Sequence, residues 1–322
     1  MTSEPTIKQV REAAERIKPF VHCTPVLTCT GLNRMCKAEI FFKCENFQKA
    51  GAFKIRGATS AVFTLTSEEA PQGVATHSSG NHGAALALAA RWRGIKAYVV
   101  MPENAPQVKR DAVAEYGAEI IFCKPTLEAR EEGLATVVDH TGAVFIHPYN
   151  DYRVISGQGT AALELCEEIP ELDVVMTPVG GGGLLSGTAL AVSALSPKTQ
   201  VIAAEPERAN DAYRSFHAGR IIPSDDPDTI ADGLRTSLGD LTFPLIRRYV
   251  GDIVTVTEEG IVTAMRFIWE RMKITVEPSA AVTLGALLTK SPQFFGKRIG
   301  IILSGGNVDL AHLPWIEKAG EQ

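Results

Sequence analysis

One lysine lies in a segment where its amine could act as a nucleophile. Lys54 stands between Phe53 and Ile55, in a stretch rich in small residues that runs from Ala50 to Ala58. A lysine kept from water has a lowered pKa, so its uncharged amine can form a Schiff base with a carbonyl compound. The same residues would also suit a solvated lysine at the start of a helix. The local sequence therefore indicates Schiff-base chemistry and leaves this second interpretation open.

A run of four glycines could bind an anion. Gly180–Gly183 follow the apolar segment Val174–Val179 and precede a helix that we expect from Leu184. Backbone N–H groups at such a turn can approach an anion closely, and the positive end of the helix favours negative charge. The chain does not contain the dinucleotide pattern G-x-G-x-x-G here, because the third glycine would fall on Leu185 or Ser186. Because no P-loop motif occurs either, a compact phosphate monoester fits better than a nucleotide.

Short apolar runs alternate with longer amphipathic stretches along the chain, which predicts an α/β architecture with mainly parallel sheets. The expected strands are Glu39–Cys44, Gly73–Thr76, Ala97–Met101, Glu119–Cys123, Val144–Ile146, Val174–Pro178, Gln200–Ala204, Ile253–Val256 and Arg298–Leu303. The expected helices are Ile7–Pro19, Ile55–Leu65, Asn81–Arg93, Gln107–Tyr116, Leu127–His140, Gly157–Ile169, Gly183–Leu195, Glu258–Met272 and Ser279–Thr289. Open parallel sheets bind ligands at the carboxyl ends of their strands, so the chemistry should lie there.

The composition excludes several classes of protein. The 322 residues include 32 Lys and Arg and 37 Asp and Glu, for a net charge of −5. This balance, with 45% apolar residues, argues against a disordered chain and against a nucleic-acid partner. No apolar run is long enough for a membrane span, and the polar start lacks the core of a signal peptide. The six cysteines match no zinc spacing, so we expect free thiols in a cytoplasmic protein.

Four motifs, in order along nearly the whole chain, resemble those of fold-type II pyridoxal-phosphate enzymes. The segment around Lys54 is similar to the cofactor-lysine motif, and Ser78–Gly83 to the substrate-binding loop. Gly180–Gly183 resemble the phosphate loop, and Ser304–Asn307 the loop beside the pyridine ring. Within this family the chain looks most like serine racemases and the serine/threonine and 3-hydroxyaspartate dehydratases. The resemblance implies two open, mainly parallel sheet domains, as in the β-subunit of tryptophan synthase.

The resemblance implies pyridoxal 5′-phosphate as the cofactor. Lys54 would hold it through a Schiff base and then remove the α-proton, while Phe53 packs on the ring. Asn81 would bond the ring hydroxyl, and Ser304 would face the pyridine nitrogen with a neutral hydroxyl. The implied phosphate-binding residues are Gly180, Gly181, Gly182, Gly183 and Leu184.

Substrate and metal positions follow from the same resemblance. The substrate α-carboxylate would be bound by the loop residues Ser78, Ser79, Gly80, Asn81 and His82. Ser79 matches the second base of serine racemases, although its hydroxyl could simply cap the following helix. Arg130 matches a position that binds a second carboxylate, or else is an exposed helix arginine. Glu205, Asp211 and the carbonyl of Ala209 match a site for Mg²⁺, or for Ca²⁺ or Mn²⁺, and could otherwise be surface acids.

We therefore expect a dehydratase that converts 3-hydroxyaspartate, serine or threonine to a 2-oxo acid and ammonia by α,β-elimination. Residues 1–72 and 151–322 would form a large cofactor-binding domain, and residues 73–150 a small substrate-loop domain. The family suggests a homodimer with a small amino-acid substrate. Serine racemase as the main activity is the first alternative. A nicotinamide oxidoreductase, suggested by Glu205 after the glycine loop, and a non-catalytic ligand-binding protein are remote ones.

Overall fold

The strands form two separate sheets in the computed structural model, which describes residues 4–78 and 80–316. The six-stranded large sheet has the order β1-β2-β10-β7-β8-β9 and is parallel except for β1, which runs antiparallel to β2. The small sheet has the order β5-β4-β3-β6 and is entirely parallel. The strands are β1 Val26–Leu27, β2 Glu39–Cys44, β3 Val74–His77, β4 Ala97–Pro102, β5 Glu119–Cys123, β6 Val144–Phe145, β7 Val174–Pro178, β8 Gln200–Pro206, β9 Asp252–Val256 and β10 Arg298–Leu303.

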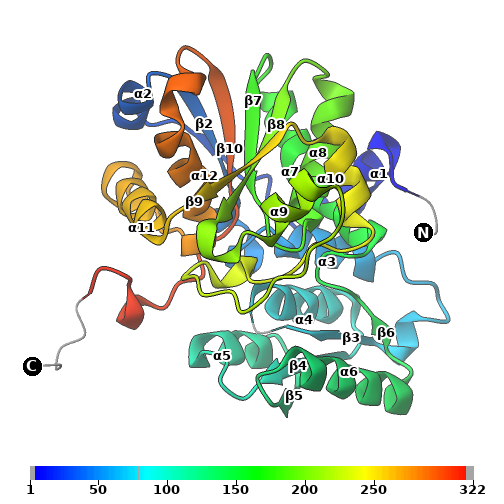
Figure 1. Cartoon of the computed structure of the whole chain (residues 1–322). Coiled ribbons are helices and arrows are strands. Elements are labelled where there is room, and N and C mark those ends of the chain that lie inside the picture. Colours follow the sequence, from blue (N-terminus) through cyan, green and yellow to red (C-terminus); the bar gives the residue numbers. More distant parts are fainter. Residues whose placement is uncertain (1–3, 79, 317–322) are drawn as a thin grey trace, which may run out of the picture.

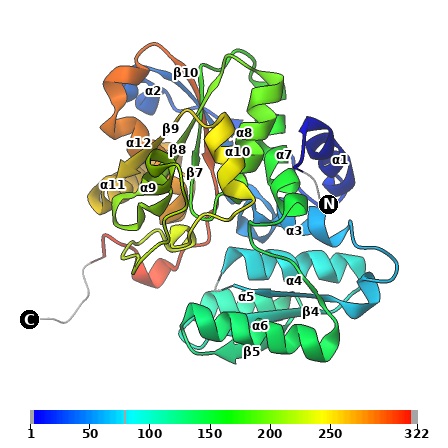
Figure 2. The same ribbon diagram turned by 45° about the vertical axis from the view of Figure 1, so that its right-hand side comes forward.

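Helices cover both faces of each sheet, and the small sheet lies below the large one in the views of Figures 1 and 2. The α-helices are α1 Ile7–Ile17, α2 Thr30–Cys36, α3 Lys54–Val62, α4 Asn81–Arg93, α5 Gln107–Glu115, α6 Leu127–Thr141, α7 Tyr152–Glu168, α8 Gly183–Leu195, α9 Asp211–Ala218, α10 Thr242–Tyr249, α11 Glu258–Phe267 and α12 Pro278–Thr289. Over the described part of the chain, no helix combines the length and the apolar character needed to cross a membrane.

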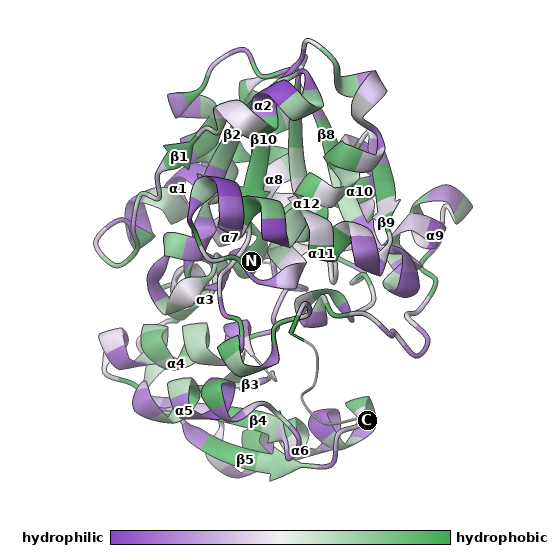
Figure 3. Cartoon of the chain, turned by 90° about the vertical axis from the view of Figure 1, so that its left-hand side faces the viewer, coloured by the Kyte–Doolittle hydropathy of each residue, from purple (hydrophilic) through white to green (hydrophobic). Residues whose placement is uncertain are grey.

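The core of the large sheet follows from the alternation of side chains along its strands. Val174 and Met176 of β7 belong to the apolar cluster under α11 and α12, whereas Val175 points to the opposite face. That face packs against α1, α7, α8 and α10. Both faces are therefore buried, and the strands of the large sheet are drawn mainly in the hydrophobic colour in Figure 3.

The two mainly parallel sheets confirm the predicted α/β class, and the predicted strands are all present. The prediction was wrong about the start of α7, which begins at Tyr152 rather than Gly157 because the Asp151 side chain accepts the N–H of Arg153. Gly157 then serves the packing of α7 on α3, where an added Cβ would lie 2.7 Å from the Cα of Gly57. Helices α2, α9 and α10 were not predicted.

A buried network of four charged residues lies behind the start of α3. The Arg56 guanidinium, 0% exposed, donates to Glu45 at 2.7 and 2.9 Å and to Glu164 at 2.7 and 2.8 Å. The amine of Lys43 lies 2.6 Å from the Glu164 carboxylate. Because Glu45 follows β2 and Glu164 belongs to α7, the network joins three elements directly behind Lys54.

Candidate active site

Lys54 is the first residue of α3, an element that packs against both α4 of the small-sheet region and α7 of the large-sheet region. Its Nζ donates a hydrogen bond of 3.0 Å to the carbonyl of Pro148, on the segment that returns from the small sheet. The Phe53 ring lies beside it, with the ring centroid 5.2 Å from Nζ. Burial lowers the pKa of Lys54 to about 8, against the opposing effect of Glu277. An appreciable fraction of this amine is therefore uncharged near neutral pH, as a nucleophile or base requires.

The end of β10 fixes the segment that leads into Lys54. The N–H of Phe53 donates to the carbonyl of Ser304 at 3.0 Å, and Ala52 pairs with Gly305. The Ser304 side chain is buried beside this pairing, and its hydroxyl makes no hydrogen bond to another described residue. Ser304 and Lys54 thus reach the same edge of the large sheet by backbone pairing, as expected for residues that follow neighbouring strands.

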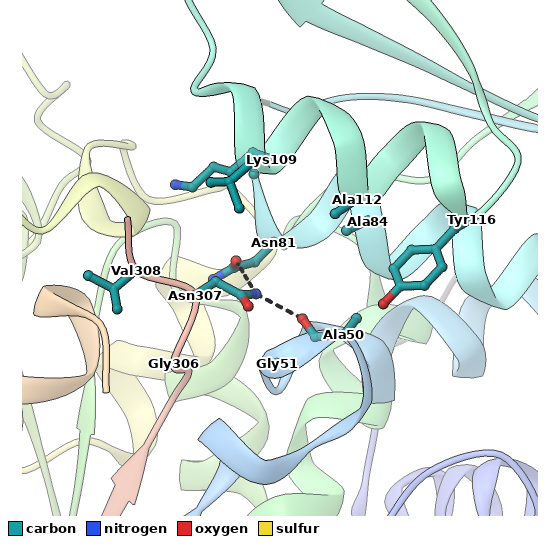
Figure 4. A pocket seen from close by; sticks show the side chains of 12 residues that line it. Ala50, Gly51, Asn81, Ala84, Lys109, Ala112, Tyr116, Gly306, Asn307 and Val308 are labelled. Carbon is teal, nitrogen blue, oxygen red and sulfur yellow. Dashed lines mark hydrogen bonds between the residues drawn. The ribbon is translucent and has the colours of Figure 1, made fainter. Parts of the chain in front are cut away.

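Asn81 lies at the junction of the two sheets, but its amide is held by other side chains of the protein. Its Nδ2 donates to both carboxylate oxygens of Glu277 at 2.9 and 3.1 Å, and its Oδ1 accepts from Asn307 at 2.9 Å. Figure 4 shows Asn81 and Asn307 side by side, next to a cavity of about 290 Å³ that Lys109 and Tyr116 also line. Neither Lys54 nor the glycine loop lines that cavity.

Glu277 is the site residue that the sequence did not reveal. Its carboxyl group is 3% exposed, and burial together with Asp232 raises its pKa to about 7. Glu277 precedes Pro278, the first residue of α12. An acidic side chain at this place is stabilised by the positive N-terminal end of the helix. That position was the one available signal, because Glu277 belongs to none of the four motifs.

The glycine loop has no room for side chains. It joins β7 to α8, and Gly182 has a φ of +90°, in the left-handed region that favours glycine. A Cβ on Gly181 would overlap the ring of Tyr149, and one on Gly183 would lie 2.9 Å from the Tyr149 Cβ. The Thr242 hydroxyl holds the loop by donating to the Gly181 carbonyl at 2.9 Å. The loop is therefore a preformed backbone cradle at a helix N-terminus, which suits a phosphate group.

The substrate-loop motif lies at the carboxyl end of β3 and opens α4. The N–H of Gly80 donates to the Ser78 hydroxyl at 3.2 Å. His82 is buried with its Nε2 3.2 Å from the carbonyl of Ile146, and burial holds its pKa well below the usual value. Ser79, the predicted second base, lies outside the described residues.

Arg130 lies in the first turn of α6, at the carboxyl edge of the small sheet. It is half-buried, and its Nε donates to the carbonyl of Thr126 at 3.3 Å. Burial and the charge of Arg130 lower the pKa of His77 to about 4. Arg130 is thus partly withdrawn from solvent, unlike the exposed arginine of the second interpretation.

The predicted metal residues lie beyond the glycine loop, at the end of β8. Glu205 is 0% and Asp211 1% exposed, and Ala209 lies between them in a short turn. The Glu205 carboxylate accepts the N–H groups of Ala212 and Tyr213, both at 2.8 Å. Burial raises the pKa of Asp211 to about 6, against the lowering effect of the nearby Ser224 hydroxyl and the Leu238 backbone N–H. These buried acids are not surface acids.

The two acids also affect each other. Burial and the charge of Asp211 hold the pKa of Glu205 well above its usual value. Two neighbouring buried carboxylates are costly unless a cation compensates them. Across the described ranges no group of three His, Cys, Asp or Glu side chains could hold a metal. The donor set that the resemblance implies consists of two carboxylates and the Ala209 carbonyl. Oxygen donors of this kind fit a hard divalent cation completed by water.

Comparison with known proteins identifies the family of the chain. The family model described as "Pyridoxal-phosphate dependent enzyme" matches residues 17–305. The chain belongs to this family of enzymes. This pyridoxal-phosphate enzyme is 54% identical over 311 residues to the beta-hydroxyaspartate dehydratase of Paracoccus denitrificans (strain Pd 1222), with 97% of this chain and 99% of the relative covered.

Two further relatives of this pyridoxal-phosphate enzyme are serine racemases. That of Arabidopsis thaliana is 53% identical, with 95% of this chain and 94% of the relative covered. The crystal structure of serine racemase from Dictyostelium discoideum superposes with a TM-score of 0.91 at 50% identity, covering 95% of this chain and 99% of that one. The cofactor fits the residues present, because a lysine with a lowered pKa suits its aldehyde and a glycine loop at a helix N-terminus suits its phosphate.

Proposed function

We propose that the protein is a dehydratase that eliminates water from a β-hydroxy-α-amino acid, with 3-hydroxyaspartate as its first substrate and serine or threonine as others. The products are a 2-oxo acid and ammonia. The observation that carries the proposal is the similarity over nearly the whole chain to a beta-hydroxyaspartate dehydratase. The half-buried Arg130 is compatible with the same substrate class, because a guanidinium suits a second carboxylate.

The protein side of the mechanism starts from Lys54. Bound pyridoxal phosphate supplies the electron sink for the pair of electrons left at Cα. Lys54 would hold the cofactor through its amine, and the same Nζ, once free and uncharged, would take the α-proton of the substrate. The N–H groups of Gly180–Gly183 and Leu184 would hold the phosphate, and Phe53 would pack on the ring. Ser304 would offer the ring nitrogen only a neutral hydroxyl, which would favour elimination because the leaving hydroxyl carries the electrons away.

The substrate is held from the small sheet. The loop N–H groups of Ser78, Gly80 and His82 bind the α-carboxylate at the start of α4, and Arg130 binds the β-carboxylate. Asn81 would bond the ring hydroxyl through Oδ1, which also accepts from Asn307, because its Nδ2 donates to Glu277. After water has left, the enamine that is released hydrolyses to the 2-oxo acid and ammonia.

Serine racemase is the second candidate activity, supported by the 53% identity to the racemase of Arabidopsis thaliana. Inversion at Cα needs a second base on the face opposite Lys54, and Ser79 would be that base. On this hypothesis, Ser79→Ala removes D-serine formation and leaves elimination in place. A domain division after residues 72 and 150, a homodimer and a cytoplasmic location stay predictions.

The dehydratase proposal is tested by measuring 2-oxo acid formation by the holoenzyme with L- and D-serine, L- and D-threonine, and the threo and erythro 3-hydroxyaspartates. We expect the highest kcat/KM for one hydroxyaspartate isomer, at least about tenfold above serine, because one charge-assisted hydrogen bond contributes about 1.5–3 kcal/mol. Preference for serine or threonine would remove the β-carboxylate role of Arg130. Absence of any 2-oxo acid would overturn the dehydratase and leave racemisation as the main activity.

A divalent cation bound by Glu205, Asp211 and the Ala209 carbonyl should stabilise the protein. At a free Mg²⁺ concentration of about 100 times its dissociation constant, the cation should add about 2.7 kcal/mol to the free energy of unfolding. With a chelator present, Asp211→Asn should be more stable than the wild type at pH 8, because it removes one of two neighbouring buried charges. Thermal unfolding with and without Mg²⁺ measures both effects.

The matched control for the cation is Asp228→Asn, at a side chain that is 83% exposed. Mg²⁺ should stabilise this variant against thermal unfolding as much as it stabilises the wild type. An Asp211→Asn protein that still responds to Mg²⁺ as the wild type does would contradict the site.

A further inference from the structure

Two histidines face each other at the carboxyl edge of the small sheet. His77 ends β3, and His147 follows β6 in the register that pairs Val74 with Val144 and Ala75 with Phe145. Their ring centroids are 6.3 Å apart at an angle of 81°. His147 also packs edge-on against Tyr149, with centroids 4.5 Å apart. An aromatic wall therefore extends from the end of the small sheet toward the glycine loop that Tyr149 covers.

The hydrogen bonds of His147 determine which of its ring nitrogens carries the proton. Its Nδ1 accepts the backbone N–H of Asn150 at 2.9 Å and that of Tyr149 at 3.3 Å. Because a backbone N–H can only donate, Nδ1 must be unprotonated. Burial, His77 and Lys54 lower the pKa of His147 to about 4, so the ring is neutral at pH 7. Its proton is therefore on Nε2, which has a fixed role as a donor.

The surroundings of this donor favour an anion. Pro148, the next residue, accepts the hydrogen bond of Lys54, so the backbone that follows His147 contacts the catalytic amine. The charge of Arg130 acts on His77 and on Tyr149, the two rings against which His147 packs. Both hydrogen bonds of the His147 ring are accepted at Nδ1, so the Nε2–H is available to a ligand. His147 therefore lies between the segment that contacts Lys54 and two rings on which the Arg130 charge acts.

We propose that His147 is a specificity-determining residue, whose Nε2–H donates a hydrogen bond to the β-carboxylate that Arg130 binds. This inference rests on the proposed dehydratase function. It assigns to His147 the preference for an amino acid with a second carboxylate over serine or threonine. A neutral donor suits this role, because it adds a directed hydrogen bond without attracting a second anion. His77 only packs against the ring.

Matched variants distinguish the donor role of Nε2 of His147 from the acceptor role of its Nδ1. In His147→Asn, the amide oxygen can still accept the Asn150 N–H, but the Nε2 donor is lost. In His147→Gln, the amide nitrogen can take the Nε2 position and the acceptor is lost. His77→Phe keeps the packing of the wall without its nitrogens. Bound-cofactor absorption and circular dichroism check that each holoenzyme is folded.

The first measurement is kcat/KM for 3-hydroxyaspartate and for serine. We expect His147→Asn to lose about 10- to 100-fold with hydroxyaspartate, the factor typical of a hydrogen bond to a charged group, and less than about threefold with serine. His147→Gln should recover most of the loss, and His77→Phe should keep the wild-type ratio within about threefold. Equal losses with both substrates, or no loss with either, would overturn the proposal.

A binding experiment judges the subsite independently of turnover. Succinate has the two carboxylates of aspartate at the same separation and no amine, and propionate has one carboxylate. Calorimetric titration of the holoenzyme should show His147→Asn weakening succinate about tenfold or more and propionate less than about threefold. Wild-type binding of succinate no tighter than propionate would overturn the subsite. Failure of the dehydratase proposal would instead appear as the absence of 2-oxo acid with every hydroxy amino acid tested.

Discussion

Replacement of Lys54 by alanine is expected to lower kcat/KM for 2-oxo acid formation by at least about 10³-fold. Two functions are lost together, because the amine both binds the cofactor covalently and accepts the α-proton. The absorption band of the lysine-bound cofactor should disappear in the same variant. In the wild type the acceptor is the uncharged amine, so activity should rise with pH and level off above the Lys54 pKa of about 8.

The matched control is Lys49→Ala, five residues earlier in the same segment. Lys49 lies over the ring of Trp92 at 5.0 Å from its centroid and does not contact Lys54, so activity should stay within about threefold of the wild type. A Lys54→Ala protein that retains elimination at a tenth of the wild-type rate would show that another group removes the proton.

The second large effect concerns stability. Arg56→Met should lower the free energy of unfolding by about 3–5 kcal/mol, because it leaves the buried carboxylate of Glu45 and the half-buried one of Glu164 without their guanidinium. The loss should also reduce cofactor binding, since the network joins β2, α3 and α7 directly behind Lys54. Thermal and denaturant unfolding measure the first effect, and cofactor titration measures the second.

Helix α7 also provides the control for this prediction. Arg11 pairs with Glu167, one turn beyond Glu164, but both side chains are 54% exposed. Arg11→Met should therefore cost at most about 1 kcal/mol. Equal losses of unfolding free energy in Arg56→Met and Arg11→Met would show that burial does not explain the contribution of the Arg56 network to stability.

The predictable part of the fold is the part that local patterns specify. The Val-rich run Val174–Val179 before the glycines indicates a buried strand, and every predicted strand is present, whereas the two-residue strand β1 was not predicted. The start of α7 was missed because Gly157 and Gly159 disfavour a helix on propensity alone. Their absent side chains instead allow α7 to pack closely on α3 and α8, which a single segment of sequence does not reveal.

The site was predictable where a residue stands in a motif and not where its role depends on tertiary contacts. Lys54 and the glycine loop come together because each follows a parallel strand of one sheet. Glu277 is remote in sequence from Asn81 and was found through the hydrogen bonds between them. Likewise, the Nε2 donor of His147 was found only because Nδ1 accepts the backbone N–H groups of Tyr149 and Asn150. No sequence pattern predicts these contacts.

The strand order of the large sheet has a consequence for the folding of the chain during its synthesis. Glu39 of β2 pairs with Arg298 of β10, so β2 leaves the ribosome long before its parallel neighbour exists. The small sheet, by contrast, is complete once β6 has been made. Until Leu303 has emerged, β2 keeps an open edge and the Lys54 segment lacks the pairing of Ala52 with Gly305. Such long-range closure is slow and leaves the nascent chain exposed to aggregation, so chaperones are expected to protect the unfinished large sheet.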